Sequence, residues 1–197
     1  MKKIVLLISL LVSLFALDIK KAYYESYNYE KMGDYKDAIK VLIPVYKEFS
    51  NGYTINLRLG WLFYLSKKYQ NALDHYKKAS LVSPFSIEAK LGIMRTYISA
   101  GDYSNALKVG EVILKTDYYN YYGNYYEVVA LYYQKRYDTA LKLINKMLSL
   151  YPTSVLFLTQ LGKVYYAKGN VKLAKRIFED ILILDPNNVV AKEYLSK

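Results

Sequence analysis

The chain contains no cysteine, and among its 197 residues there is only one histidine, His75. Without cysteine it can form no disulfide bond, carries no reactive thiol, and cannot bear a lipid on a lipoprotein cysteine. One histidine without cysteine cannot supply the nitrogen and sulfur ligands of a typical zinc site. The sequence therefore predicts a protein with no metal site and no covalent cross-links.

Motifs that carry catalytic chemistry are also missing. The sequence has no glycine-rich phosphate-binding loop and no G-x-S-x-G nucleophile turn. Acidic pairs such as Asp34 with Asp37 are typical of solvated helix faces, and a glycosidase-like pair would require two carboxylates that converge in a cleft. We expect His75 on the outer, solvated face of a helix. We therefore predict no catalytic residue, no cofactor and no enzymatic activity.

Proline and glycine are scarce, with 4 and 9 residues, and no long linker or low-complexity tail interrupts the chain. What the sequence contains instead is a period of 34 residues. Apolar or aromatic residues recur nine residues before and seven residues after each of five periodic alanines. A period of this length is typical of stacked helix–turn–helix units, and the apolar spacing predicts two helices of about 14 residues in each. The alanines are Ala38, Ala72, Ala106, Ala140 and Ala174.

The turn between the two helices of each repeat has its own signature. Gly33-Asp34, Gly101-Asp102 and Gly169-Asn170 share one position in repeats one, three and five. Glycine can end the first helix in the left-handed conformation, and Asp or Asn can cap the next helix. Repeats two and four have Lys67-Lys68 and Lys135-Arg136 there, so these turns are less strongly specified.

The prolines mark helix ends. Pro84, Pro152 and Pro186 follow the predicted second helices of repeats two, four and five, where those helices should stop. Pro44 differs, because it falls inside the predicted second helix of repeat one. Since proline cannot donate a hydrogen bond to the carbonyl of Lys40, we expect a kink or an early helix end there.

These residues together resemble the tetratricopeptide repeat (TPR) family. The resemblance covers residues 19–188 and implies an all-α fold, a right-handed TPR-type α-solenoid of five helix–turn–helix repeats with a short C-terminal capping helix. The implied repeats span 19–52, 53–86, 87–120, 121–154 and 155–188, and the capping helix covers 189–197. Repeat two carries the most complete pattern, with Leu59, Gly60, Phe63, Tyr69, Ala72, Tyr76, Ala79 and Pro84. Repeat five follows with Leu161, Gly162, Tyr165, Ala174, Phe178 and Pro186.

One position of the first helix, where the family usually has glycine or alanine, departs from the pattern in three repeats. Ser26 and Val128 stand there in repeats one and four, and Met94 in repeat three. We expect Met94 to push the two helices of its repeat apart or to shift their register.

In TPR proteins the first helices line a concave groove, and the resemblance assigns to it the second, fifth, ninth, twelfth and thirteenth residues of each repeat. In this chain those positions are rich in tyrosine and include the single tryptophan and an arginine, which are residue types enriched at binding hot spots. Some TPR groups hold a C-terminal carboxylate with Lys and Asn in their first repeats. Tyr23 and Tyr27 occupy those places here, so that clamp is not carried over. The candidate partner-binding residues are Tyr23, Tyr27, Leu57, Trp61, Tyr64, Leu91, Arg95, Tyr122, Tyr125, Tyr132, Tyr133, Lys163 and Tyr166.

Residues 118–133 are unusually dense in tyrosine. One helix cannot direct all of these rings the same way, so some must pack in the core, some must face the groove and some must lie at the edge. The rings can serve binding, or tyrosine can simply have replaced other large residues as a habit of composition. The sequence leaves both interpretations open.

Residues 1–16 resemble a secretory signal peptide, with Lys2 and Lys3 before an apolar run from Ile4 to Phe15. The run is shorter than the roughly 20 residues that span a bilayer as a helix. We expect an exported, periplasmic protein. The alternative is an uncleaved anchor, with residues 4–17 in contact with the membrane and the protein facing the periplasm or the cell surface.

The formal net charge is +11, but the basic residues are scattered over all repeats, so we expect no nucleic-acid partner. The favoured function is a non-catalytic scaffold or adaptor of the cell envelope. It would bind a peptide segment or helix of another envelope protein in the aromatic-rich concave groove. Two alternatives stay open: binding of a glycan or cell-wall polysaccharide by stacked Tyr and Trp rings, and structural self-association.

Overall fold

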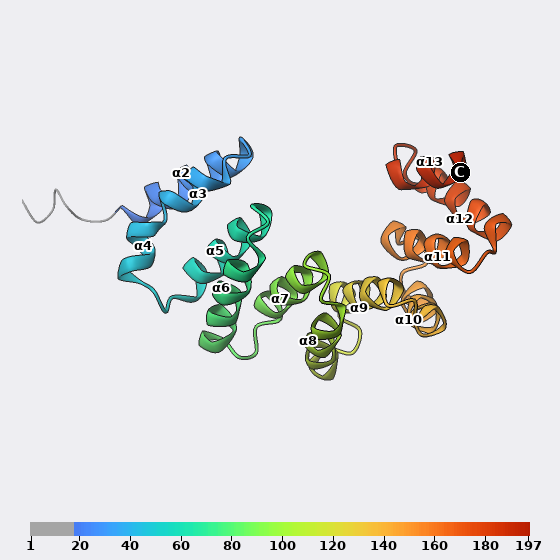
Figure 1. Cartoon of the computed structure of the whole chain (residues 1–197), viewed down its shortest axis with the longest axis horizontal. Coiled ribbons are helices and arrows are strands. Elements are labelled where there is room, and N and C mark those ends of the chain that lie inside the picture. The colour runs from blue at the N-terminus through green and yellow to red at the C-terminus, as the bar shows by residue number, and fades with distance from the viewer. Residues whose placement is uncertain (1–17) are drawn as a thin grey trace, which may run out of the picture. The chain divides into compact units, whose positions relative to one another are not determined.

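The computed structural model describes residues 18–197. Within this range every regular element is an α-helix and no β-strand is present (Figure 1), which confirms the predicted all-α fold class. No helix among the described residues is long and apolar enough to cross a membrane. The signal peptide or anchor expected in residues 1–16, and the membrane contact expected of residues 4–17, lie outside the described residues.

Short connections join the helices in chain order. The chain divides into two compact bodies at Ala89 and Lys90, in the first turn of α7. The N-terminal body therefore holds α2 to α6, and the C-terminal body holds most of α7 and all of α8 to α13. The helices are α2 (Ile19–Lys31), α3 (Tyr35–Lys40), α4 (Ile43–Glu48), α5 (Tyr53–Leu65), α6 (Tyr69–Val82), α7 (Ile87–Ser99), α8 (Tyr103–Thr116), α9 (Tyr121–Tyr133), α10 (Tyr137–Leu150), α11 (Val155–Ala167), α12 (Val171–Leu184) and α13 (Val189–Ser196).

The glycine turns form as predicted. Gly33, Gly101 and Gly169 have φ angles of 77°, 79° and 83°, which lie in the left-handed region that favours glycine. In each case the next residue caps the following helix, because its side chain accepts a hydrogen bond from a backbone N–H three residues later.

Repeats two and four build the same turn from less suitable residues. Lys67 and Lys135 both adopt a φ of 59°, although neither is glycine. The residues that follow them, Lys68 and Arg136, make no side-chain cap to α6 or α10. Because the left-handed conformation costs a residue with a Cβ about 1 kcal/mol, the packing of the two helices must impose this turn.

Pro44 interrupts the second helix of repeat one, as the sequence predicts. The helix ends at Lys40, and a new helix, α4, begins at Ile43 with Pro44 in its first turn. Between the two helices the Leu42 N–H donates a hydrogen bond to the Ile39 carbonyl at 3.0 Å. This bond spans three residues, so the turn is tighter than that of an α-helix, where the bond spans four. Repeat one therefore contains two helices of 6 residues each where the other repeats have one of 14.

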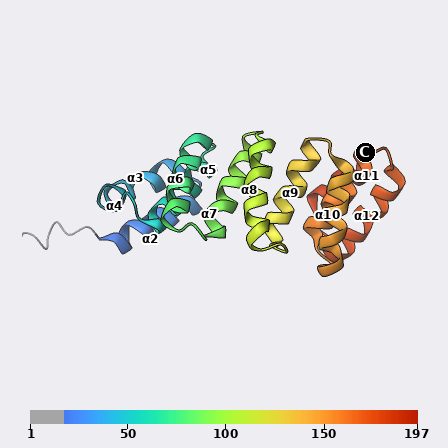
Figure 2. The ribbon, with the colours of Figure 1, turned by 90° about the horizontal axis from the view of Figure 1, so that it is seen from below.

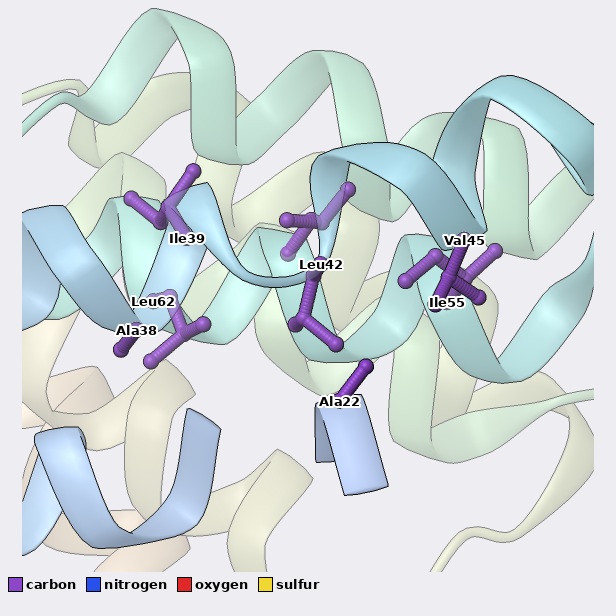
Figure 3. Close-up of a cluster of buried hydrophobic side chains, with 8 residues drawn as sticks. Ala22, Ala38, Ile39, Leu42, Val45, Ile55 and Leu62 are labelled. Atoms are coloured by element: carbon purple, nitrogen blue, oxygen red, sulfur yellow. The ribbon is translucent and has the colours of Figure 1, made fainter. Parts of the chain in front are cut away.

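The core of the N-terminal body lies between α2, α3, α4 and α5 (Figure 3). Its periodic alanine, Ala38, is fully buried, and so are the other four periodic alanines of the chain. This confirms the alanine period as a packing signal, because a small side chain lets two helices approach closely. The buried cluster consists of Ala22, Ala38, Ile39, Leu42, Val45, Ile55, Leu59 and Leu62.

The C-terminal body contains two buried clusters. One lies between α9, α10 and α11, and includes Ile144 and Phe157. The other joins α11, α12 and α13, where the Phe178 ring stacks on Tyr194 of the capping helix at 4.7 Å. Figure 2 shows these helices from a second side, and each packs against its neighbours in chain order. The capping helix thus covers apolar surface that α12 would otherwise expose.

A small residue on one helix of a repeat faces a large residue on the other. A Cβ added to Gly60 would lie 2.8 Å from the Tyr76 ring, and one added to Gly162 would lie 2.7 Å from the Phe178 ring. In repeat three the glycine lies on the second helix and the large residue on the first. A Cβ added to Gly110 would lie 2.7 Å from the terminal methyl carbon of Met94. The missing side chain of Gly110 therefore leaves room for Met94, whereas the expected change in the spacing or register of the two helices stays a prediction.

Candidate functional site

The thirteen candidate residues lie on the first helices α2, α5, α7, α9 and α11, and we call their two subsets the first-helix face of each body. None of the thirteen is fully buried, and Tyr27, Tyr122 and Tyr133 are at least half exposed. The N-terminal body carries the five from Tyr23 to Tyr64, and the C-terminal body carries the eight from Leu91 to Tyr166.

Arg58 joins the two first helices of the N-terminal body. Its side chain is only 6% exposed. One guanidinium nitrogen, Nη1, donates to Oε2 of Glu30, and Nη2 donates to the Ser26 hydroxyl at 3.0 Å. The other carboxylate oxygen of Glu30 accepts a hydrogen bond from Trp61 Nε1 at 2.6 Å. Since Ser26 and Glu30 belong to α2 while Arg58 and Trp61 belong to α5, this polar network holds the two helices in one register.

The same network orients the aromatic rings of this face. The Arg58 guanidinium lies 3.8 Å from the centroid of the Tyr27 ring, a cation–π distance. Trp61, held by Glu30, stacks on Tyr64 with 5.6 Å between ring centroids. Rings that are already ordered lose little conformational freedom when a partner covers them. The N-terminal body therefore presents a preorganised aromatic surface.

Sequence reasoning missed Arg58, which stands at the sixth position of its repeat and outside the positions assigned to the groove. A signal was nonetheless present. Arg58 is the only charged residue of α5, and Ser26 replaces the usual glycine or alanine of the neighbouring first helix. The structure explains that departure, since the Ser26 hydroxyl accepts the hydrogen bond from Arg58.

In the C-terminal body, candidate residues of α9 and α11 form a cluster with the capping helix α13. The Tyr125 hydroxyl is hydrogen-bonded to the side chain of Gln160, and the Tyr132 hydroxyl to Tyr194. Lys163 Nζ lies 5.7 Å from the centroid of the Tyr132 ring. Tyr194 was not among the candidates, because the resemblance assigns no groove position to the capping helix.

Burial shapes the electrostatics of this second face. It lowers the pKa of the Lys163 ammonium, an effect that the nearby Glu193 carboxylate opposes. Burial also raises the pKa of Tyr132 to about 12, with neighbouring tyrosines adding to the shift. Tyr132 therefore stays a neutral hydrogen-bonding hydroxyl at physiological pH.

Four candidates of the C-terminal body lie outside this cluster. Tyr133 stacks in parallel on Tyr103 of α8, with 4.9 Å between centroids. Tyr122 meets the edge of Tyr121 at 5.3 Å. Leu91 and Arg95 are half-buried on α7.

Two segments of the chain match family models of the tetratricopeptide repeat, residues 25–81 and residues 131–193. Together the matches cover more than half of the chain. The chain belongs to the tetratricopeptide repeat family. One match lies in the N-terminal body and one in the C-terminal body, so both bodies carry TPR sequence.

Solved structures of other TPR proteins share this fold. MamA from Desulfovibrio magneticus RS-1 is 18% identical, with a TM-score of 0.72 over 86% of this chain and 96% of that chain. A thermophilic TPR protein from Thermus thermophilus is 14% identical, with a TM-score of 0.73 over 90% of this chain and 97% of that chain. YrrB, described as a TPR protein with an unusual peptide-binding site, is 14% identical, with a TM-score of 0.66 over 92% of this chain and all of its own. None of the curated proteins compared with the chain matches its sequence.

Membership of the TPR family supports a coarse function. TPR proteins are generally non-catalytic scaffolds that bind protein or peptide partners. In the part of the chain that the structure describes, no group of three or more His, Asp or Glu residues could hold a metal ion.

The tyrosine side chains of residues 118–133 in this TPR chain occupy three kinds of position. Tyr121 packs inward, with its hydroxyl 2.6 Å from the Ser154 hydroxyl and its ring against Phe157. Tyr122 and Tyr133 belong to the first-helix face. Tyr118 is exposed in the α8–α9 connection, where Lys146 Nζ lies 3.9 Å from its ring.

His75 does not lie on the outer, solvated face that we expected. Its ring stacks on Phe63 at 5.2 Å and meets the edge of Tyr46 at 5.1 Å. Its Nδ1 is 2.9 Å from Oδ1 of Asn56, a residue whose amide nitrogen donates to the carbonyls of Ser50 and Gly52. The Asn56 oxygen must therefore accept, so the neutral imidazole carries its proton on Nδ1. His75 is a packing residue between α4, α5 and α6.

Proposed function

We propose that this TPR protein is a non-catalytic adaptor of the cell envelope that binds a peptide segment or helix of another envelope protein on its first-helix face. The carrying observation is that a tyrosine-rich surface, held in place by buried polar contacts, is left uncovered. An exposed aromatic surface of this kind is typical of an interaction site. A peptide partner would cover it through ring contacts and through hydrogen bonds to the tyrosine hydroxyls.

Two further points support a peptide partner over a small molecule. Within each body the face extends over successive first helices, which suits an extended chain or a helix better than a compact ligand. YrrB, which shares the fold, is described as having a peptide-binding site. The chemistry of the rings suits a segment of mixed apolar and polar side chains.

The envelope location is part of the proposal and has its own test. Residues 1–16 carry the sequence pattern of a secretory signal. Cell fractionation with an antibody against the described domain should find the protein outside the cytoplasm. Recovery of the whole population from the cytoplasmic fraction would remove the envelope from the proposal and leave the binding surface untouched.

The binding test uses two exposed tyrosines, one on the first-helix face of each body, and two matched tyrosines elsewhere. The full chain captures partners from native envelope extract, and the segment bound by a captured protein is synthesised for titration. Tyr27→Ala/Tyr122→Ala removes rings that are 50% and 53% exposed on the face. Tyr24→Ala/Tyr119→Ala removes rings that are 69% and 52% exposed outside it. Circular dichroism confirms that both variants are folded.

We expect Tyr27→Ala/Tyr122→Ala to raise the dissociation constant for the synthetic segment at least about tenfold, as loss of a binding hot spot does. Tyr24→Ala/Tyr119→Ala should bind like the parent. Equal binding by both variants would move the site away from the first-helix face. If no protein is captured but the chain sediments with isolated cell wall, the glycan alternative replaces this proposal.

A further inference from the structure

Helices α6 and α12 hold the same place in repeats two and five, and α6 carries a stripe of charged and apolar side chains on one face. Asp74, Lys77 and Lys78 are followed one turn later by Leu81 and Val82. The spacing of three, four, seven and eight residues from Asp74 places all five on one side of the helix. All five are exposed, and Leu81 is 79% exposed.

Helix α12 repeats this stripe with every charge reversed. Three periods further along the chain, Arg176, Glu179 and Asp180 are followed by Ile183 and Leu184. An acid on α6 thus corresponds to a base on α12, and two bases correspond to two acids. These five residues are also exposed, with Ile183 at 79%. The two stripes are complementary in charge and alike in their apolar ends.

The other second helices lack this combination. At the two apolar positions repeat three has Lys115 and Thr116, and repeat four has Ser149 and Leu150. Repeat one has Lys47 and Glu48 there, at the end of α4. The stripe is therefore not a general consequence of the TPR pattern but a feature of two helices.

We infer that the occupant of the α6 stripe is a second copy of this chain, docked through its α12 stripe. With the two helices parallel and in register, Asp74 meets the partner's Arg176, and Lys77 and Lys78 meet the partner's Glu179 and Asp180. Leu81 then packs on the partner's Ile183. An antiparallel arrangement would set charges against aliphatic side chains, so the charge order specifies the parallel one.

The physical chemistry of the patch sets the strength of this contact. Burial of the exposed aliphatic ends supplies the attraction, and the rim charges select the partner and the orientation. Two helix faces bury less area than a standard stable interface, so the association should be weak, in the micromolar range or above. Exposed ion pairs are screened by salt, so the association should weaken as ionic strength rises.

Sedimentation equilibrium of the full chain tests the inference. Measurements cover about 5 to 200 µM protein at low and at high salt, a range suited to weak association. We expect the mean mass to rise with concentration at low salt and to fall again at high salt. A closed dimer and a longer chain both support the inference, since each copy carries one stripe of each kind. A constant monomeric mass at low salt over the whole range would overturn it.

Charge reversal identifies the surfaces. Lys77→Glu/Lys78→Glu makes both stripes of a copy acidic, and Glu179→Lys/Asp180→Lys makes both basic. Each variant alone should associate at least about tenfold more weakly than the parent, because like charges then face each other. An equimolar mixture of the two should associate again, since every contact between unlike copies regains opposite charges.

Glu111→Lys is the matched control, because Glu111 stands at the same repeat position as Lys77 and Glu179 but on α8. It should associate like the parent. All substituted side chains are exposed, and circular dichroism checks that each variant is folded. Self-association unchanged by both double reversals, or a mixture that stays monomeric, would contradict the inference. Binding of the partner segment at the first-helix face is an independent readout that these variants should leave unaltered.

Discussion

At the scale of single residues, His75 and Asn56 show how one hydrogen bond sets the response of the N-terminal body to acid. Asn56 anchors the connection between α4 and α5 through the carbonyls of Ser50 and Gly52, and His75 satisfies its remaining oxygen. Repeat four has the same asparagine, Asn124, which bonds to two carbonyls in the same way. There the residue matching His75 is Leu143, and the Asn124 oxygen has no hydrogen-bond partner among the described residues.

We expect the stability of the parent protein to fall between pH 6.5 and pH 4 because of His75. Burial lowers the pKa of His75 from 6.5 to about 4; the positive charge of Lys78 adds to this and the Asp74 carboxylate opposes it. Since the unfolded state binds the proton more readily, the free energy of unfolding decreases as the pH drops below 6.5. The loss at pH 5 is at most about 2 kcal/mol, because solvent screens part of the effect at this partly exposed ring.

His75→Leu, which copies the residue of repeat four, isolates this effect. Urea unfolding at pH 7.5 and pH 5 should give a smaller loss of stability for the variant than for the parent. The variant leaves the Asn56 oxygen unpaired, so its stability at pH 7.5 should be lower than that of the parent by about 1 kcal/mol. If parent and variant lose the same stability between the two pH values, His75 does not keep its lowered pKa in solution.

At the scale of elements, repeats two, three and five bring their two helices together by placing a glycine against a large residue. The arrangement can be exchanged between the helices, as Met94 and Gly110 show, provided that the sum of volumes is kept. The two arrangements differ in how well they tolerate an added methyl group at the glycine. The Phe178 ring that faces Gly162 is fully buried and rigid, whereas the atom nearest to Gly110 is the terminal methyl group of a flexible methionine.

We predict that Gly162→Ala destabilises the C-terminal body by about 1–2 kcal/mol, because the overpacking against Phe178 exceeds the gain in helix propensity. Gly110→Ala should stay within about 0.5 kcal/mol of the parent, because Met94 can rotate its methyl group away while the helix gains propensity. Chemical unfolding monitored by circular dichroism compares the two. An equal cost at both positions would show that Met94 is as rigid as Phe178.

At the scale of the whole molecule, stability should vary along the chain, because each repeat of a repeat protein is stabilised mainly by its neighbours. We expect repeat one to be the least stable repeat. Its second helix is divided by Pro44 into α3 and α4, and each of these has 6 residues. Ordering the first turn of a helix costs conformational entropy, and a short helix forms few internal hydrogen bonds to offset that cost.

We expect amide hydrogen exchange in α3 and α4 to be at least about tenfold faster than in α10 and α12, which have 14 residues each. Pro44→Leu restores the missing donor and should slow exchange in residues 41–46, as α3 and α4 join into one helix. The exchange of α10 serves as the internal control. Uniform protection along the parent chain would show that repeat one is as stable as the rest.

Periodicity together with the backbone chemistry of glycine and proline determined the fold class, the repeat length, the glycine turns and the break at Pro44, because each of these depends on local backbone chemistry or on spacing along one helix. The five alanines stand at packing positions in every repeat, and the structure buries all of them. The resemblance to the TPR family, not the spacing, assigned the candidate face, and the structure leaves each of its residues at least partly exposed.

Only the tertiary structure decided which side chains meet across helices. The contact of Arg58 with Ser26 and Glu30, the contact of His75 with Asn56, and the exchange between Met94 and Gly110 all join residues 16 to 32 positions apart. A pattern along one helix reports which side of that helix is apolar, but not which residue of the next helix lies opposite. That pairing depends on the distance and register of the two helices, which follow from the packing of the whole repeat.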